Sequence, residues 1–179
     1  LFLPFIDLIH ERAQVIGLNG PIDYRRDRLG HMDMWMVPNG AASTKALSSA
    51  FFRLTDYPPE DRAHVPTEDI PVQGGRTLHV PKSLKGVAVF SFKRLCGEPR
   101  GAADYLAIAR RFHTVMIVGI PQLGPENRNE AARFVTLIDA LYENSVKLIA
   151  AADAAPGALY TTGDGAFEFE RTVSRLEEM

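Results

Sequence analysis

The sequence predicts an α/β fold, a mostly parallel sheet with helices on its faces. Short, almost wholly apolar runs alternate with longer segments whose apolar residues recur every three or four positions. The links between them are short, and this order favours parallel strands joined by crossover helices. Residues 114–118, Thr-Val-Met-Ile-Val, have the composition of a strand buried on both faces.

Length and composition narrow the class of protein further. The chain has 179 residues, of which 46% are hydrophobic and 23% charged, so it can bury a sizeable core and is not a disordered chain. Twenty basic and twenty-two acidic residues give a net charge of −2, which provides no basic field for nucleic acid. One cysteine excludes an internal disulfide, and no apolar run approaches the ~20 residues of a transmembrane helix.

The first part of the chain is expected to begin with an amphipathic helix over residues 1–13 and a short strand over 14–18. Asn19-Gly20-Pro21 is a turn signal that closes this strand. A second strand over residues 32–37 is expected to end at Pro38-Asn39-Gly40.

The next helix should run from Ser43, as its N-cap, to about Leu54. Its apolar spacing places Ala46, Leu47, Ala50 and Leu54 inward. Residues 56–69 are the expected boundary, and within them Tyr57-Pro58-Pro59-Glu60-Asp61 is polar, Pro-rich and not expected to be helical.

A β-hairpin is expected around Gly74-Gly75, with strands over residues 70–73 and 77–80. A two-residue loop would mix apolar and polar side chains on each face. A three-residue loop of Gly74, Gly75 and Arg76 sets Val72 opposite Leu78 and Ile70 opposite Val80, so this register is preferred.

The second half contains the clearest alternation of strands and helices. Strands are expected over residues 87–92, 114–118 and 146–150, and helices over 101–112, 125–143 and 167–178. The buried stripes of the first two of these helices should be Tyr105, Ile108, Ala109 and Phe112, then Phe134, Leu137, Ile138 and Leu141.

An α/β chain invites a search for a nucleotide site. No Gly-x-x-x-x-Gly-Lys-Ser/Thr motif occurs. Gly97 and Gly101 precede a helix, but Glu98 between them would repel phosphate and Pro99 lacks an N–H. No carboxylate follows the strand at 114–118 before Glu126. By itself the chain is therefore not expected to bind and hydrolyse a nucleoside triphosphate.

Other candidate groups each have a structural alternative. Cys96 near a predicted helix N-terminus could be a reactive thiol, but a small buried residue that closes a strand is favoured. His113 beside Arg110 and Arg111 could touch an anion, although a structural histidine at a helix-to-strand corner is favoured. Arg128 and Arg133 fit either a solvated surface or an anion contact.

Several segments resemble one known family, the ZapE cell-division ATPases and their mitochondrial lactation-elevated relatives. The first two are Leu-Phe-Leu-Pro-Phe-Ile-Asp and Leu-Asn-Gly-Pro-Ile-Asp-Tyr-Arg. The matching segments run in the expected order through most of the chain: 1–7, 18–25, 95–97, 103–115, 130–135, 146–149 and 167–179. One departure is Val118-Gly119, where family members often carry an Asp.

The resemblance implies a division of the chain. In that family an AAA+ P-loop ATPase module precedes an additional α/β region. Residues 1–27 would then be the last helix and strand of the ATPase module, and 28–68 a strand, a helix and a Pro-rich linker. Residues 69–179 would form an α/β domain that is a degenerate relative of the P-loop fold. The phosphate loop, the magnesium-binding strand and the arginine finger are expected upstream of Leu1.

The resemblance also implies a function for the complete protein. It would use ATP and Mg²⁺ to remodel a protein partner, either the FtsZ division ring or substrates of protein quality control. The fragment itself would be non-catalytic, would need no cofactor, and would contact the upstream ATPase module. An oligomer and a cytoplasmic bacterial location, peripheral at the inner membrane or division site, are expected. Nucleic acid is not an expected partner.

Particular residues acquire roles by the same resemblance. Arg25, in the segment Gly-x-x-Asp-Tyr-Arg, resembles a nucleotide-sensing arginine that reaches the γ-phosphate. Independently of the resemblance, the basic residues Arg110, Arg111, Arg128 and Arg133 are the candidate interaction surface. Two alternatives remain open: a stand-alone binding or structural domain with no nucleotide link, and a thiol enzyme built on Cys96.

Overall fold

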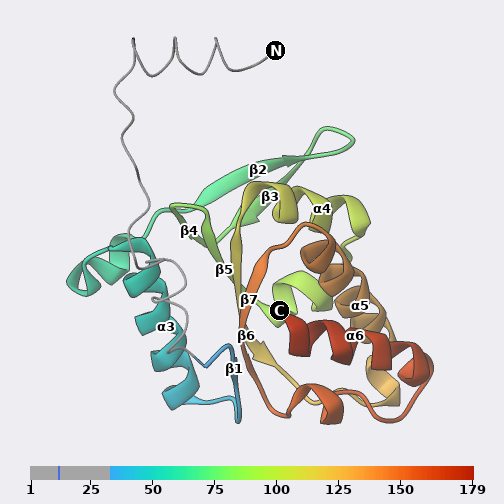
Figure 1. Cartoon of the computed structure of the whole chain (residues 1–179). Coiled ribbons are helices and arrows are strands. Elements are labelled where there is room, and N and C mark those ends of the chain that lie inside the picture. The colour runs from blue at the N-terminus through green and yellow to red at the C-terminus, as the bar shows by residue number, and fades with distance from the viewer. Residues whose placement is uncertain (1–11, 13–32) are drawn as a thin grey trace. The chain divides into compact units, whose positions relative to one another are not determined.

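A five-stranded sheet forms the centre of the fold in the computed structural model, which describes residue 12 and residues 33–179 (Figure 1). The helix and strand expected before residue 32 lie outside the described residues. The strand order is β1-β7-β6-β5-β4. In chain order the strands are β1 (Trp35–Met36), β4 (Lys82–Leu84), β5 (Val87–Ser91), β6 (Thr114–Ile120) and β7 (Lys147–Ala152).

Four of the five strands run parallel. β1 pairs with β7, β7 with β6 and β6 with β5 in parallel, whereas β4 pairs with β5 in antiparallel fashion. The mostly parallel sheet predicted from the apolar runs is therefore confirmed. The strands predicted at 87–92, 114–118 and 146–150 are β5, β6 and β7, with ends that differ by one or two residues.

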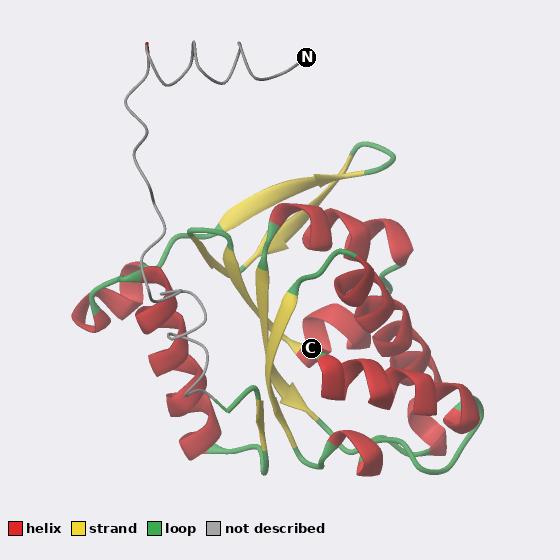
Figure 2. Cartoon of the chain, in the orientation of Figure 1, coloured by secondary structure: helices red, strands yellow, loops and turns green. Residues whose placement is uncertain are grey.

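Helices cover both faces of this sheet, but unequally (Figure 2). α4 (Ala102–Arg111), α5 (Arg128–Glu143) and α6 (Ala166–Glu178) lie on one face. α3 (Ala41–Thr55) lies on the other. The larger side is filled by a core in which Tyr105, Phe134 and Phe169 are at most 1% exposed.

α4 and α5 bury the residues that their apolar spacing predicts to face the core. Tyr105, Ile108, Ala109 and Phe112 are all buried, and so are Phe134, Leu137, Ile138 and Leu141. These stripes were predicted and are confirmed. Pro125 begins a short 3-10 turn (Pro125–Asn127) that leads into α5, as expected of a proline in a first helical turn.

α3 differs from the prediction in its start and in its inward face. It begins at Ala41 after Gly40, and Ser43 is not its N-cap: the Ser43 hydroxyl donates to the Pro38 carbonyl. Ser43 is buried together with Leu47, whereas Ala46 is exposed. Hydrogen bonding to a backbone carbonyl lets the polar Ser43 be buried within the helix, where the prediction had it as the N-cap.

The hairpin forms with the predicted loop length but in another register. β2 (Glu68–Val72) and β3 (Arg76–Val80) pair Ile70 with Leu78 and Val72 with Arg76. The predicted pairs, Val72 with Leu78 and Ile70 with Val80, are wrong by two residues. The apolar faces were assigned correctly because strand side chains repeat every two residues.

Two further elements were not expected. The Pro-rich stretch contains a 3-10 helix, Pro59–His64, so its predicted lack of helical structure is wrong. Pro59 stands in its first turn, where a missing N–H is harmless. Strand β4 was also missed, because its turn into β5 is made by Lys85-Gly86, and Lys is not a usual turn residue.

The first described elements belong to the same compact unit as the rest, Asp33–Met179. β1 is an edge strand of the main sheet, and α3 covers one of its faces. Residues 33–68, which the sequence separates from the α/β domain at 69–179, thus contribute a strand and a helix to it.

The turn between β4 and β5 provides a test of this packing. Gly86 has φ of +77°, and a Cβ there would lie 2.6 Å from His113 Cδ2. The His113 ring cannot move freely, because Nε2 donates to the Lys85 carbonyl and Nδ1 accepts from the Thr114 hydroxyl, each at 2.9 Å. We expect Gly86→Ala to lower the free energy of unfolding by about 2–4 kcal/mol in urea denaturation.

Gly75→Ala is the matched control. Gly75 has a similar φ of +74°, but nothing lies within 4 Å of the added methyl. Only backbone strain remains, about 1 kcal/mol. Equal losses in the two variants would contradict the contact with His113.

Candidate functional site

The N-terminus of α4 is the place in the described chain that most resembles a phosphate site, because it follows Gly97 and Gly101. The Asp104 carboxylate fills it. Asp104 is only 2% exposed, and its Oδ2 accepts a hydrogen bond from the Gly101 N–H at 2.9 Å. Arg76 of the hairpin donates to both carboxylate oxygens, at 3.0 and 3.3 Å.

This arrangement decides what the helix end can bind. A free helix N-terminus attracts anions through its N–H groups and its dipole. Here the protein's own carboxylate takes that position, and a bidentate arginine neutralises it. A phosphate at the same place would meet a buried negative charge, so this helix end is not a phosphate cradle.

The 3-10 turn Pro125–Asn127 that precedes α5 also has a side-chain cap. Glu126 lies in the preceding 3-10 turn, and the Asn127 side-chain oxygen accepts from the Gly124 N–H at 3.1 Å. Within residues 33–179 no group of three or more His, Cys, Asp or Glu side chains could hold a metal ion. Among the described residues, Asp104 thus fills the N-terminus of α4, and no cluster that could hold a metal ion is found.

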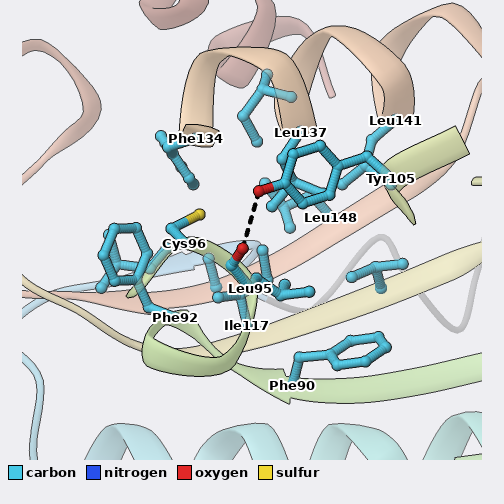
Figure 3. Close-up of a cluster of buried hydrophobic side chains, with 14 of the residues drawn as sticks. Phe90, Phe92, Leu95, Cys96, Tyr105, Ile117, Phe134, Leu137, Leu141 and Leu148 are labelled. Carbon is cyan, nitrogen blue, oxygen red and sulfur yellow. Dashed lines mark hydrogen bonds between the residues drawn. The ribbon is translucent and has the colours of Figure 1, made fainter. Parts of the chain in front are cut away.

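Cys96 lies inside the core rather than at a reactive surface (Figure 3). It is 0% exposed, and burial is the main cause that raises the pKa of its thiol far above the ordinary value. Burial likewise raises the pKa of Tyr105, whose hydroxyl donates to the Leu95 carbonyl at 2.8 Å. A neutral, enclosed thiol fits the structural interpretation of Cys96 and not the thiol-enzyme alternative.

Arg133 was predicted to be part of an interaction surface, but it points toward this core. Its Nη1 donates to the Cys96 carbonyl at 2.7 Å. Arg100 Nε donates to the Arg94 carbonyl at 2.9 Å. Both carbonyls belong to the π-helical segment Lys93–Gly97 that follows β5, so the two arginines satisfy its carbonyl groups.

Arg128 lies at the opposite end of the sheet from Arg110 and Arg111. It begins α5, which follows the carboxyl end of β6, whereas Arg110 and Arg111 end α4 and precede the amino end of β6. Arg128 forms an ion pair with Asp164 at 3.0 Å, and both side chains are about 70% exposed (68% and 72%). The four predicted arginines do not form one surface.

Arg110 and Arg111 do share a surface. They lie at one end of a groove of about 640 Å³ between α4 and the β2–β3 hairpin, here called the Arg110–Arg111 groove. Arg111 Nε forms an ion pair with Glu68 Oε1 at 2.6 Å. Arg110 is exposed and has no ion pair among the described residues. The remaining lining residues are Ile70, Pro71, Gln73, Ala103, Leu106 and Ala107.

His113 and Arg25 complete the list of predicted residues. His113 bonds Thr114 and the Lys85 carbonyl at the corner between α4 and β6, so the structural interpretation is confirmed. Arg25 lies outside the described residues.

The sequence interpretation missed the ion pairs that hold the hairpin. The spacing from Gly101 to Asp104 is that of a helix N-cap and the third residue after it, which could have indicated the role of Asp104. Its partner Arg76 is 28 residues away, and Glu68 is 43 residues from Arg111. No local pattern predicts such distant partners.

Comparison with known proteins gives the family. The model of the AFG1-like ATPases matches residues 1–179, the whole chain. The chain belongs to the AFG1-like ATPase family. The resemblance that the sequence motifs indicated is confirmed, because relatives in the comparison include a ZapE protein and a lactation elevated protein homologue.

Three relatives show the range of the family. An uncharacterised protein of Schizosaccharomyces pombe is 40% identical over 162 residues, 90% of this chain and 35% of its own length. Cell division protein ZapE of Escherichia coli K12 is 33% identical over 178 residues, 99% of this chain and 46% of its own length. Lactation elevated protein 1 homolog B of Danio rerio is 30% identical, covering 99% of this chain and 41% of its own.

The chain spans less than half the length of each of these relatives. No solved structure matches it significantly. Among the described residues, none of the helices has the length and apolar character needed to cross a membrane.

The pair of Arg76 and Asp104 gives a second test. We expect Asp104→Ala to lower the free energy of unfolding by about 2–3 kcal/mol, since it removes a helix cap and the ion pair together. Arg76→Ala should cost about 1–2 kcal/mol, because Arg76 is 55% exposed and water replaces part of the interaction. A double-mutant cycle by urea denaturation should give a coupling of about 1 kcal/mol or more.

Arg128→Ala provides the control for this cycle. Both side chains of its ion pair with Asp164 are exposed, so the variant should lose no more than about 0.5 kcal/mol of unfolding free energy. Additive effects of Arg76→Ala and Asp104→Ala would refute the proposed coupling between the hairpin and α4.

Proposed function

We propose that the complete protein is an AAA+ ATPase that uses ATP and Mg²⁺ to remodel a protein partner in cell division. The observation that carries this proposal is the match of the whole chain to the AFG1-like ATPases, together with a relative named cell division protein ZapE. A stand-alone domain with no nucleotide link is not favoured, because the family match extends over all 179 residues.

The unit Asp33–Met179 is, in this proposal, the non-catalytic part that recognises the partner and couples it to the ATPase module. Two observations support this assignment. The sequence contains no phosphate-binding loop, and the N-terminus of α4 is filled by Asp104 and Arg76. The residues that bind ATP and Mg²⁺ would then belong to the longer protein.

Arg25 is the proposed nucleotide sensor in the complete protein. Its support is the segment from Gly20 to Arg25, Gly-Pro-Ile-Asp-Tyr-Arg, which resembles the sensor segment of the family. A guanidinium fork can bridge two phosphate oxygens, so its contact would be lost when the γ-phosphate leaves.

The Arg110–Arg111 groove is the proposed surface for the partner. It combines apolar side chains of α4 and the hairpin with the exposed, unpaired charge of Arg110 within the described part of the chain. Such a combination suits an acidic surface with apolar anchors. The first candidate is the tubulin-like FtsZ ring, which would place the protein in the cytoplasm at the division site.

The ATPase assignment is tested with the complete protein and with this chain alone. We expect Mg²⁺-dependent ATP hydrolysis by the complete protein, and a fall in kcat of about tenfold or more for Arg25→Ala. Arg62→Ala, at an exposed position in the 3-10 helix Pro59–His64, should keep the wild-type rate. Isothermal titration of the 179-residue chain with ATP and Mg²⁺ should show no binding.

Two outcomes would contradict this assignment. Wild-type turnover by Arg25→Ala would remove the sensor role of this residue. Tight binding of ATP by the 179-residue chain would show that the fragment holds a nucleotide site of its own.

The partner surface is tested by co-sedimentation of the complete protein with FtsZ filaments. Arg110→Glu reverses the unpaired charge, and we expect about tenfold weaker binding. Lys147→Glu makes the same charge change at an exposed position outside the groove and should bind normally. If both variants bind as well as wild type, the groove is not the contact surface for FtsZ.

A further inference from the structure

The two faces of the main sheet differ in how completely they are covered. Within residues 33–179, the α-helices α4, α5 and α6 lie on one face and the α-helix α3 on the other. On the larger side Phe90 of β5 and Ile117 of β6 are 0% exposed. Their chain neighbours Val89 and Val118, which point to the α3 face, remain partly exposed.

This exposure is unusual for the strands concerned. Parallel strands that are apolar on both sides are normally covered on both sides. β5 and β6 have that composition, and yet the α3 face is open over Val89 and Val118. The sheet therefore presents an apolar surface that the described part of the chain leaves without a second covering element.

The open area has the form of a groove. It encloses about 370 Å³ between α3 and the β4–β5 side of the sheet, and we call it the α3 groove. Phe51 and Phe52 of α3 form one wall, and Val89 and Val118 lie on the sheet side. Phe51 is buried, whereas Phe52 is partly exposed and offers an aromatic contact surface.

The charges on this groove have one sign. Lys82 and Arg94 are the charged residues among the described ones that line it, and no carboxylate lines it with them. Neither cation has an ion pair within the described part of the chain. By contrast, Lys85 beside the same turn pairs with Asp56 at 3.8 Å, and Arg111 pairs with Glu68.

We propose that the α3 groove binds an acidic amphipathic helix of a protein partner. A helix is the element that covers such sheets, and its apolar stripe would pack on Val89, Val118 and Phe52. Carboxylates beside that stripe would pair with Lys82 and Arg94. This surface is on the opposite face of the sheet from the Arg110–Arg111 groove, and its binding does not depend on ATP hydrolysis.

The experiment uses the 179-residue chain and two synthetic peptides. The first is an amphipathic helix of about five turns with Leu on one stripe and Glu beside it. The second keeps every Leu and replaces each Glu by Lys. By fluorescence anisotropy we expect saturable binding of the Glu peptide and at least about tenfold weaker binding of the Lys peptide.

Charge-reversal variants locate the contact. The double variant Lys82→Glu with Arg94→Glu should bind the Glu peptide at least about tenfold more weakly. The control is Arg128→Glu with Lys147→Glu, which changes the net charge equally at two exposed positions that do not line the groove, with Arg128 on α5 of the opposite face. Its affinity should stay within about threefold of wild type, because distant exposed charges are screened.

Methyl NMR identifies the face that is bound. The Glu peptide should shift the methyl signals of Val89 and Val118 and leave Val135, on α5 of the opposite face, unchanged. Absence of saturable binding, shifts confined to Val135, or equal binding by the Lys82→Glu/Arg94→Glu variant would each overturn the proposal. Self-association that this variant abolishes, without peptide binding, would identify a second copy of the chain as the occupant instead.

Discussion

Strand β6 sets the main constraint on this structure, since its residues are apolar on both sides and must be removed from water on both sides. Val115, Met116 and Ile117 are all 0% exposed, although they alternate between the two faces of the sheet. Burial of such side chains contributes about 1.5–3 kcal/mol each. The crossover helices α4 and α5 cover one face, and α3 covers part of the other, where Met116 is buried and Val118 stays partly exposed (Figure 1).

A buried carboxylate connects this core to the hairpin and also limits its chemistry. Asp104 caps α4 and receives both Arg76 bonds, so the hairpin is fixed to the helix by a charged contact as well as by apolar packing. A buried carboxylate without such partners would be strongly unfavourable. The same contact occupies a helix N-terminus, the kind of position at which many α/β proteins bind phosphate. Asp104 thus stabilises the unit from the position that a nucleotide phosphate would need, so the two cannot occupy it together.

Predictions from local periodicity were correct for α4, α5 and the central strands, but Ala46, which was predicted to face inward on α3, is exposed. The stripes of α4 and α5 and the strands β5, β6 and β7 follow from spacing and composition alone. The errors have a common cause. The hairpin register, the strand β4 and the buried Ser43 depend on turn conformations and on backbone carbonyl partners, and neither appears in a hydrophobic pattern.

By itself the sequence determined the fold class, the buried stripes of α4 and α5 and the family of this protein, because repeats of two and 3.6 residues and ordered motifs are local properties. Only the tertiary structure decided which charged residues meet. It separated Arg128 and Arg133 from Arg110 and Arg111, and it left Lys82 and Arg94 beside an uncovered apolar surface. These outcomes depend on which helix lies on which face of the sheet, and that choice brings together residues far apart in the chain.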